Sequence, residues 1–317
     1  MIQAGIIGGA GYTGGELIRL LLPHPQIQLK FVHSNSQAGR LVHETHADLL
    51  GETDLRFTGD LTDAVDVLFL CVGHGEASKF LHQFSIGNHV KIIDLSQDHR
   101  LDQWVYGLPE LNRDQIQLAH RVANPGCFAT AIQLALLPLA AHGLLGGEVH
   151  INATTGSTGA GQKPTDTSHF SWRHSNLSVY KAFEHQHLGE IGQSLRQLQP
   201  GYAHALNFVP QRGSFTRGIL ATAYTRTDLT LAEAQSIYQK YYQSAPFTHL
   251  SANNPDLKQV VNTNKCVLYL EKHGDNLFVI SLIDNLTKGA SGQALQNCNL
   301  MFGLEESTGL RLKAAAF

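Results

Sequence analysis

The segment Ile2–Leu22, IQAGIIGGAGYTGGELIRLLL, decides the fold of this chain. It begins with a short apolar run, passes through three glycines spaced three residues apart, and ends in a stretch with helical apolar spacing. The pattern predicts a buried strand, a glycine turn and an amphipathic helix, which is the arrangement of a dinucleotide-binding turn. Glycine permits a positive φ and a close approach of phosphate, and the helix N-terminus offers N–H groups. The residues that we expect to bind the cofactor there are Gly8, Gly11, Tyr12, Thr13 and Gly14.

The next hundred residues continue to alternate between strand and helix. A second strand is expected at 27–34, and further strands at 66–72 and 90–96, where the apolar run is continuous. A helix is expected at 73–84. Continuous apolar strands are typical of parallel sheets covered on both faces, so the order predicts an α/β fold with a Rossmann-type doubly wound sheet. Cys71 would lie in a buried strand as a small apolar residue.

The loop after the second strand bears on the choice of cofactor. A site for NAD usually places an acid there to bind the ribose 2′-hydroxyl, but no Asp or Glu occurs between Leu17 and His43. Ser34, Ser36 and Arg40 follow the strand instead, and hydroxyls with a guanidinium suit a 2′-phosphate. The sequence therefore favours NADP(H), with a solvated polar loop as the alternative.

Composition excludes several other classes of protein. The 317 residues are 43% apolar and 15% charged with a formal net charge of −3, so no basic field favours nucleic acid or an anionic membrane. The four cysteines form no C-x-x-C pair and the 18 histidines are scattered, so we expect no disulfide scaffold and no metal site. The absence of a signal-like start and of a long apolar run favours a cytoplasmic location.

The segment 124–137, NPGCFATAIQLALL, places a thiol at the expected start of a long apolar helix. Pro125 and Gly126 break the preceding segment, so Cys127 would lie in the first helical turn. The positive end of a helix lowers the pKa of such a thiol and raises its thiolate fraction. Cys127 is therefore a candidate nucleophile, and a buried cysteine without chemistry is the alternative.

Later segments offer partners for that thiol. Residues 148–161, EVHINATTGSTGAG, predict a strand and a Gly/Ser/Thr loop whose N–H groups and hydroxyls can hold an anion. His185 and His187 precede an expected helix, and an imidazole can manage the protons of a cysteine nucleophile. The pair lacks a convincingly spaced third ligand for a metal. Arg217 precedes a strand and can bind a carboxylate or phosphate.

The rest of the second half favours an α+β arrangement with antiparallel strands. Residues 265–286 alternate on both arms of an expected hairpin around His273–Asn276. A glycine turn then leads into a C-terminal helix with an apolar face. Arg212 is expected to face water, and Cys266 and Cys298 are expected to pack inside.

Seven motifs, in this order, resemble the N-acetyl-γ-glutamyl-phosphate reductase family, which is related to aspartate-semialdehyde dehydrogenase. The resemblance covers essentially the whole chain, and the set is far more specific than any one member. The motifs are GGAGYTGGELIRLLL (8–22), YGLPEL (106–111), NPGCFATA (124–131), TTGSTGAG (154–161), HQH (185–187) before Glu190, RGIL (217–220) and DNLTKGASGQALQN (284–297).

The resemblance implies a Rossmann domain, residues 1–126 and 289–317, interrupted by an inserted α+β catalytic domain, residues 127–288. It implies NADPH-dependent reduction of N-acetyl-γ-glutamyl phosphate to the semialdehyde in arginine biosynthesis, through a thioester on Cys127, in a homodimer or homotetramer. The acyl group stays open, since N-succinylglutamyl or carrier-linked aminoadipyl phosphate would need only local changes. The H-x-H pair argues against aspartate-semialdehyde dehydrogenase itself.

The resemblance also assigns roles to single residues. His187 or His185 would be the acid/base, and the sequence does not choose between them. Asn285 and Gly289 would lie near the nicotinamide. The residues expected to contact substrate are Ser157, Thr158, Gly159, Glu190 and Arg217.

This chain departs from the family pattern at three positions. The usual H-R-H-x-P-E segment has Gln186 and Gly189 here, which removes a cation and a helix-starting proline, and Gln211 stands where the family often has a histidine.

The sequence also bears on two rival classes of protein. A cysteine–histidine acyltransferase or hydrolase without a dinucleotide is disfavoured by the intact glycine turn, and a silent NADP-sensing regulator is disfavoured by the thiol at position 127.

Overall fold

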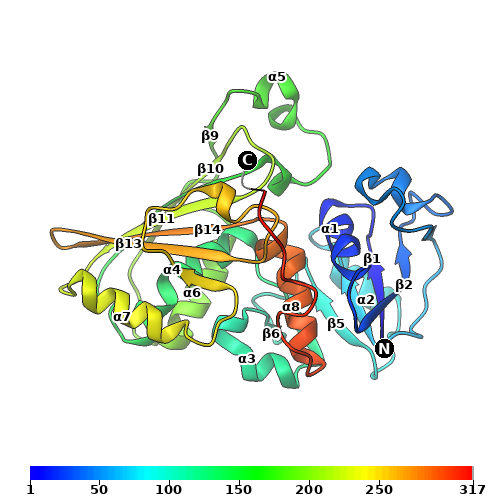
Figure 1. The fold of residues 1–317 in the computed structure, drawn as a ribbon, viewed down its shortest axis with the longest axis horizontal. Coiled ribbons are helices and arrows are strands. Elements are labelled where there is room, and N and C mark those ends of the chain that lie inside the picture. The colour runs from blue at the N-terminus through cyan, green and yellow to red at the C-terminus, as the bar shows by residue number, and fades with distance from the viewer. Residues whose placement is uncertain (316–317) are drawn as a thin grey trace. The chain divides into compact units, whose positions relative to one another are not determined.

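The computed structural model describes residues 1–315, which form two compact units. Unit 1 comprises Met1–Pro125 and Ala290–Arg311, and unit 2 comprises Gly126–Gly289 with the described residues after Arg311. Each unit is built on its own seven-stranded sheet (Figure 1). Among the described residues, none of the helices has the length and apolar character that a membrane span requires.

The sheet of unit 1 is parallel throughout and reverses its strand order next to its first strand. Its strands are β1 (Ile2–Ile7), β2 (Ile27–His33), β3 (Phe57–Thr58), β4 (Val67–Leu70), β5 (Lys91–Asp94), β6 (Val105–Tyr106) and β7 (Arg121–Ala123). They lie in the order β3-β2-β1-β4-β5-β7-β6, with every pair parallel. Ligands of such sheets bind at the carboxyl ends of the strands where the order reverses, here between β1 and β4. The expected α/β fold is confirmed.

Four helices belong to unit 1, and the one from the C-terminal part of the chain packs on two of the others. They are α1 (Tyr12–Leu21), α2 (Glu76–Gln83), α3 (Pro109–Leu118) and α8 (Gly292–Met301). Helix α8 contacts α1, α3 and β5, and Cys298 within it is fully buried, as expected. Helix α3 was not predicted from the sequence, because it buries little more than Pro109, Asn112 and Ile116 and so has no clear apolar stripe.

The sheet of unit 2 is mixed and carries helices on one face. Its strands are β8 (Val149–Thr155), β9 (Ser178–Val179), β10 (Leu206–Arg212), β11 (Ile219–Arg226), β12 (Thr248–Leu250), β13 (Cys266–His273) and β14 (Asn276–Ile283). The order is β12-β13-β14-β11-β8-β10-β9. The expected hairpin is β13–β14, and the expected antiparallel pairing also joins β11 to β14 and to β8. Two further pairs, β8 with β10 and β12 with β13, are parallel.

Helices α4 (Cys127–Ala141), α6 (His187–Leu198) and α7 (Leu231–Tyr241) cover one face of this sheet, with α4 against both the sheet and the other two helices (Figure 1). A short helix, α5 (Phe170–Arg173), lies in the loop between β8 and β9. Along β8 and β11 the buried residues alternate with more exposed ones, as a sheet with one covered face requires. Short 3₁₀ segments span Val42–Glu44, Ala47–Leu49, Ser157–Ala160, Asp166–Ser168 and Leu257–Gln259, and a π-helical turn spans Thr287–Ser291.

Helix α4 is the centre of the unit 2 core, and it contains a proline. Residues 128–140 of α4 are all buried. Pro138 has no N–H, so the carbonyl of Leu134, four residues earlier, lacks its usual helical donor. The Tyr242 hydroxyl donates to that carbonyl at 2.6 Å, and the Tyr238 hydroxyl donates to the carbonyl of Ala135. Two tyrosine hydroxyls at the end of α7 thus support the helix around its proline.

We expect Tyr242→Phe to lower the free energy of unfolding by about 1–2 kcal/mol, because it leaves the buried Leu134 carbonyl without this donor. In a Pro138→Ala background the restored N–H at position 138 takes over, so the same substitution should cost much less. Urea denaturation measures both steps, with Tyr224→Phe at the surface as the control. Equal losses in the two backgrounds would contradict this account of α4.

Candidate active site

Cys127 is the first residue of α4, and Gly126 is its N-cap. The N–H and the hydroxyl of Thr130 both donate to the Gly126 carbonyl, at 2.8 and 3.0 Å, and close the first turn. The Cys127 side chain is partly exposed, whereas Cys71, Cys266 and Cys298 are buried. Burial raises the pKa of the Cys71 and Cys298 thiols to about 12. Of the four thiols, only Cys127 combines solvent access with the positive end of a helix.

Gly289 lies directly against Cys127. A Cβ placed on Gly289 would stand 2.8 Å from the Cβ of Cys127 and 3.2 Å from its Cα. Gly289 belongs to the π-helical turn Thr287–Ser291, a rare conformation that is frequent at functional sites. The Cβ and Cα atoms of Cys127 therefore leave no space for a side chain at position 289. The expected contact between Gly289 and a nicotinamide stays a prediction.

Glu190 connects the histidine pair to the start of α4. This buried carboxylate accepts the N–H of Gly126 through Oε2 at 2.9 Å, and its Oε1 lies 3.8 Å from Nε2 of His187. The Gly126 N–H is at the helix start, where backbone donors lack partners within the helix. Glu190 was expected to bind substrate, but both of its oxygens face protein groups here.

The two histidines differ in their surroundings. The His185 ring packs edge-on against Phe128 and Phe208, and its Nδ1 accepts the His187 N–H at 3.3 Å, so the neutral ring carries its proton on Nε2. Burial, with a smaller effect of the Lys181 charge, lowers the pKa of His185 to about 4. His185 is therefore neutral at neutral pH, and His187 is the ring that lies beside a carboxylate.

The Gly/Ser/Thr loop is bound to the segment before β11. The N–H groups of Ser157 and Thr158 donate to the carbonyls of Phe215 and Thr216 at 2.8 and 3.2 Å, and the Gly159 N–H donates to Gly156 at 3.2 Å. All three N–H groups are therefore used inside unit 2. Substrate contact by Ser157, Thr158 and Gly159 stays a prediction.

Arg217 forms an internal ion pair in place of the expected open clamp. Its Nε and one terminal nitrogen donate to the two carboxylate oxygens of Asp284 at 2.9 and 3.0 Å, and the same nitrogen donates to Thr287. Asp284 is fully buried and also accepts three backbone N–H groups. The Nε edge of the guanidinium is thus occupied by Asp284, to which the sequence did not point, and contact of Arg217 with a substrate carboxylate stays a prediction.

The side chains of Asn285 and Gln211 also form hydrogen bonds within unit 2. The Asn285 amide accepts the Gly218 N–H at 2.7 Å and donates to the Thr158 hydroxyl at 2.9 Å. Gln211 accepts the Thr154 hydroxyl at 2.9 Å, and both residues lie on the face of the sheet opposite to α4. A histidine at position 211 would therefore lie on the face of the sheet opposite to the helix that carries Cys127.

The expected cofactor turn in unit 1 has the geometry that its glycines predict. Gly8 has φ +81°, and a Cβ on Gly14 would stand 2.6 Å from the backbone of Gly9, so both positions require glycine. A Cβ on Gly11 would meet nothing closer than 3.9 Å. The fold leaves room above Gly11, the N-cap of α1, and α1 then begins with Tyr12 and Thr13. A phosphate group fits this open space.

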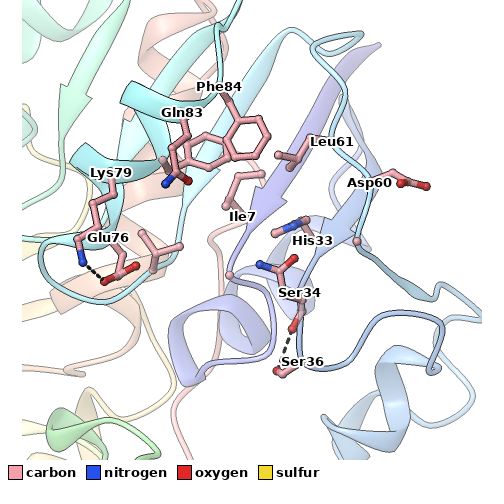
Figure 2. A pocket seen from close by; sticks show the side chains of 15 residues that line it. Ile7, His33, Ser34, Ser36, Asp60, Leu61, Glu76, Lys79, Gln83 and Phe84 are labelled. Carbon is pink, nitrogen blue, oxygen red and sulfur yellow. Dashed lines mark hydrogen bonds and ion pairs between the residues drawn. The ribbon is translucent and has the colours of Figure 1, made fainter.

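A pocket of about 660 Å³ opens beside this turn and is lined within unit 1 by Gly8, Ser34 and Ser36 (Figure 2). Its volume is within the range of small-molecule sites. The hydroxyls of the two serines lie 3.4 Å apart. Lys79, which the sequence analysis missed because it lies on α2, also lines the pocket and is paired with Glu76 at 2.8 Å.

Arg40 forms its hydrogen bonds with residues other than these two serines. Its guanidinium donates to Glu44 and to Gln37, each at 2.9 Å, and it is not among the residues that line the pocket. The contact of Arg40 with a 2′-phosphate therefore stays a prediction. Among the described residues, no group of three or more His, Cys, Asp or Glu side chains is arranged to hold a metal ion.

Comparisons with known proteins give the chain a family. A model described as semialdehyde dehydrogenase, NAD binding domain, matches residues 3–119, and one described as semialdehyde dehydrogenase, dimerisation domain, matches residues 127–285. The chain is 57% identical over 322 residues to the N-acetyl-gamma-glutamyl-phosphate reductase of Parabacteroides distasonis and 58% identical over 322 residues to that of Bacteroides thetaiotaomicron, with 100% of each chain covered. The resemblance inferred from the motifs is confirmed.

Solved structures support the fold. Aspartate semialdehyde dehydrogenase II from Vibrio cholerae, complexed with ASA, has a TM-score of 0.75 at 16% identity and covers 96% of this chain and 98% of its own. Aspartate semialdehyde dehydrogenase with NADP from Candida albicans has a TM-score of 0.73 at 13% identity and covers 95% and 98%. At such identities the likeness concerns the fold alone.

The contact between Gly289 and Cys127 leads to a test by stability. We expect Gly289→Ala to lower the free energy of unfolding by about 1–3 kcal/mol, because its Cβ overpacks the start of α4. Cys127→Gly removes the opposing Cβ, so Gly289→Ala should cost clearly less in that background. Urea denaturation gives both values, with Gly147→Ala as the control, where no atom lies within 4 Å. Additive effects of the two substitutions would refute the contact.

Proposed function

The chain belongs to the N-acetyl-γ-glutamyl-phosphate reductases of the semialdehyde dehydrogenase family, and from this premise we propose that it reduces N-acetyl-γ-glutamyl phosphate to N-acetylglutamate semialdehyde and phosphate with NADPH, as a step of arginine biosynthesis. The observation that carries the proposal is a partly exposed thiol at the start of α4, next to a buried carboxylate that also faces an imidazole. A nucleophile, a base and an orienting third group are the parts that covalent acyl transfer needs.

In the first step the Cys127 thiolate attacks the γ-carbonyl carbon. A C–S bond forms, the C–O bond to phosphate breaks, and a thioester and inorganic phosphate result. The positive end of α4 favours the thiolate, and the first-turn N–H groups of the helix favour the oxyanion that develops on the carbonyl oxygen.

In the second step the thioester becomes the aldehyde. The reduced nicotinamide, when bound, supplies the hydride. The tetrahedral oxyanion then collapses, the C–S bond breaks, and His187 gives a proton to the departing sulfur. We assign this role to His187 because it lies beside Glu190, whereas His185, with a pKa of about 4, is neutral at neutral pH and has no imidazolium proton to give. Glu190 is a positioning residue in this scheme.

NADP(H) is the cofactor that we propose. The glycine turn with its open space at Gly11, and the hydroxyls of Ser34 and Ser36 at the end of β2, support it. In Figure 2 the carboxylate of Asp60, an acid at the rim of the pocket, points away from the two serines. The position where an NAD site usually has its acid is occupied by serine.

We also propose a homodimer or homotetramer, which the description of the matched dimerisation domain supports. The proposed location is the cytoplasm, supported by four cysteines that form no disulfide in the described chain.

The nucleophile is tested by Cys127→Ser. Its rate of acyl-phosphate reduction, followed by NADPH absorbance, should fall by about 10³-fold or more, because a serine hydroxyl beside a histidine at a helix start is a far weaker nucleophile than a thiolate. Cys298→Ala, in the core of unit 1, is the control. A variant at position 127 with the wild-type rate would end the assignment. Running N-acetyl, N-succinyl and carrier-linked acyl phosphates in parallel identifies the acyl group.

The cofactor preference is tested by Ser34→Asp. A carboxylate at the end of β2 repels a 2′-phosphate and suits a 2′-hydroxyl, so the ratio of kcat/KM for NADPH over NADH should fall by about tenfold or more. NADPH binding by fluorescence gives a second readout without turnover. Ser171→Asp, on α5, is the control. A wild-type protein that uses NADH as well as NADPH would overturn the NADP assignment.

A further inference from the structure

Arg212 is a cation whose purpose the proposed mechanism leaves open. It is the last residue of β10, and within the described chain no carboxylate forms an ion pair with it. The buried residues Phe208 and Pro210 mark the face of β10 that looks toward the helices, and Arg212 follows on that same face. The Phe208 ring lies 5.3 Å from Phe128 and 5.4 Å from His185. The expectation that Arg212 faces water is therefore wrong, because its side chain lies on the face that carries the candidate active site.

Tyr180 holds the guanidinium in place. The Arg212 guanidinium carbon lies 4.6 Å from the centre of the Tyr180 ring. The two strands pair with Arg212 opposite Ser178, and the Tyr180 N–H donates to the Pro210 carbonyl, so Tyr180 and Arg212 are diagonal neighbours on one face. The same tyrosine ring lies 5.7 Å from the ring of His185.

One donor of this guanidinium lacks an acceptor. The Nε atom of Arg212 is buried and donates to no atom of the described residues. A buried N–H without an acceptor costs free energy, and such groups in native proteins require an explanation. An acceptor brought by a ligand supplies one.

The neighbourhood of Arg212 is rich in positive charge. Arg173 donates through its guanidinium to the Arg212 carbonyl at 2.6 Å and also to the Thr167 carbonyl and the Ser178 hydroxyl. The pKa of Arg173 is lowered, first by burial and then by the charge of Arg212. Lys181 lies close enough to contribute to the lowered pKa of His185. Positive charges gathered in one place attract an anion.

Arg212 and the candidate nucleophile Cys127 both affect the pKa of the Tyr180 hydroxyl. The pKa of Tyr180 is raised to about 12, first by burial and then by the charge of the Cys127 side chain, whereas Arg212 opposes the rise. An anion held at Arg212 is therefore within electrostatic reach of a molecule that reacts at Cys127.

We propose that Arg212 binds a carboxylate of the acyl-phosphate substrate, with Tyr180 as the residue that positions the guanidinium. The inference rests on the proposed function of this site. A planar guanidinium matches a carboxylate through two parallel hydrogen bonds. The Nε edge of Arg217 is already paired with Asp284, whereas the Nε of Arg212 has no acceptor among the described residues.

The reverse reaction separates the two anions of the substrate, because the semialdehyde carries the carboxylate and inorganic phosphate is a separate reactant. In Arg212→Gln we expect KM for the semialdehyde to rise about 10- to 100-fold, the loss of one charge-assisted hydrogen-bonded contact. KM for phosphate and for NADP should change less than about threefold. Arg212→Lys should recover part of the loss, since it keeps the charge but not the planar fork. Arg226→Gln, at the exposed end of β11, is the matched control.

Folding and thiol reactivity are measured on the same variants. Melting temperature and the rate of Cys127 alkylation without substrate should match the wild type, because Arg212 acts on the substrate and not on the thiol. A rise in KM for phosphate alone, or no rise in either KM, would overturn the inference while the wild-type reaction stands. A wild-type protein without turnover in either direction would remove the proposed function and the inference together.

Discussion

The hydrogen bond from the Gly126 N–H to the Glu190 carboxylate is the constraint on which the rest of the site depends. It fixes the start of α4 against α6 and brings a negative charge to the positive end of the helix that carries Cys127. That negative charge would disfavour a thiolate on Cys127 unless a cation balances it. His187 lies 3.8 Å from the same carboxylate. In the proposed mechanism its imidazolium form supplies the balancing positive charge, and Glu190 interacts with both the helix start and the His187 ring.

The surroundings of Cys127 and His187 distinguish them from the other cysteines and from His185. Burial raises the pKa of the Cys71 and Cys298 thiols, which keeps them protonated, and it keeps the His185 ring neutral at neutral pH. The backbone of Gly289 lies against Cys127 and leaves no room for a side chain. The packed interior of α4, supported at its proline by Tyr242, gives these groups a rigid base.

Local patterns in the sequence predicted the parts that depend on neighbouring residues. The glycine turn, the strands at β1, β2, β4 and β5, the hairpin β13–β14 and the thiol at a helix start all follow from spacing within about twenty residues. The contacts that the sequence did not predict join partners far apart in the chain. Arg217 binds Asp284 across 67 residues, and the carbonyls of Phe215 and Thr216 accept the N–H groups of Ser157 and Thr158. Side-chain chemistry indicates what each group can bind, but the pairing of β11 with β14 and with β8 decides which groups meet.

Arg212 also bears on the departure of this chain from the family pattern. Gln186 stands between the two histidines where the family usually has arginine, and its amide accepts from Lys181 at 3.3 Å. Arg212 lies at the end of β10, on the face that holds Phe208 and the His185 ring. A guanidinium from a strand is fixed by the ladder and by the Tyr180 ring, whereas one from the loop before a helix depends on a less regular backbone. In the proposed binding mode, the cation that meets the anionic substrate therefore comes from this strand and not from the residue between the two histidines.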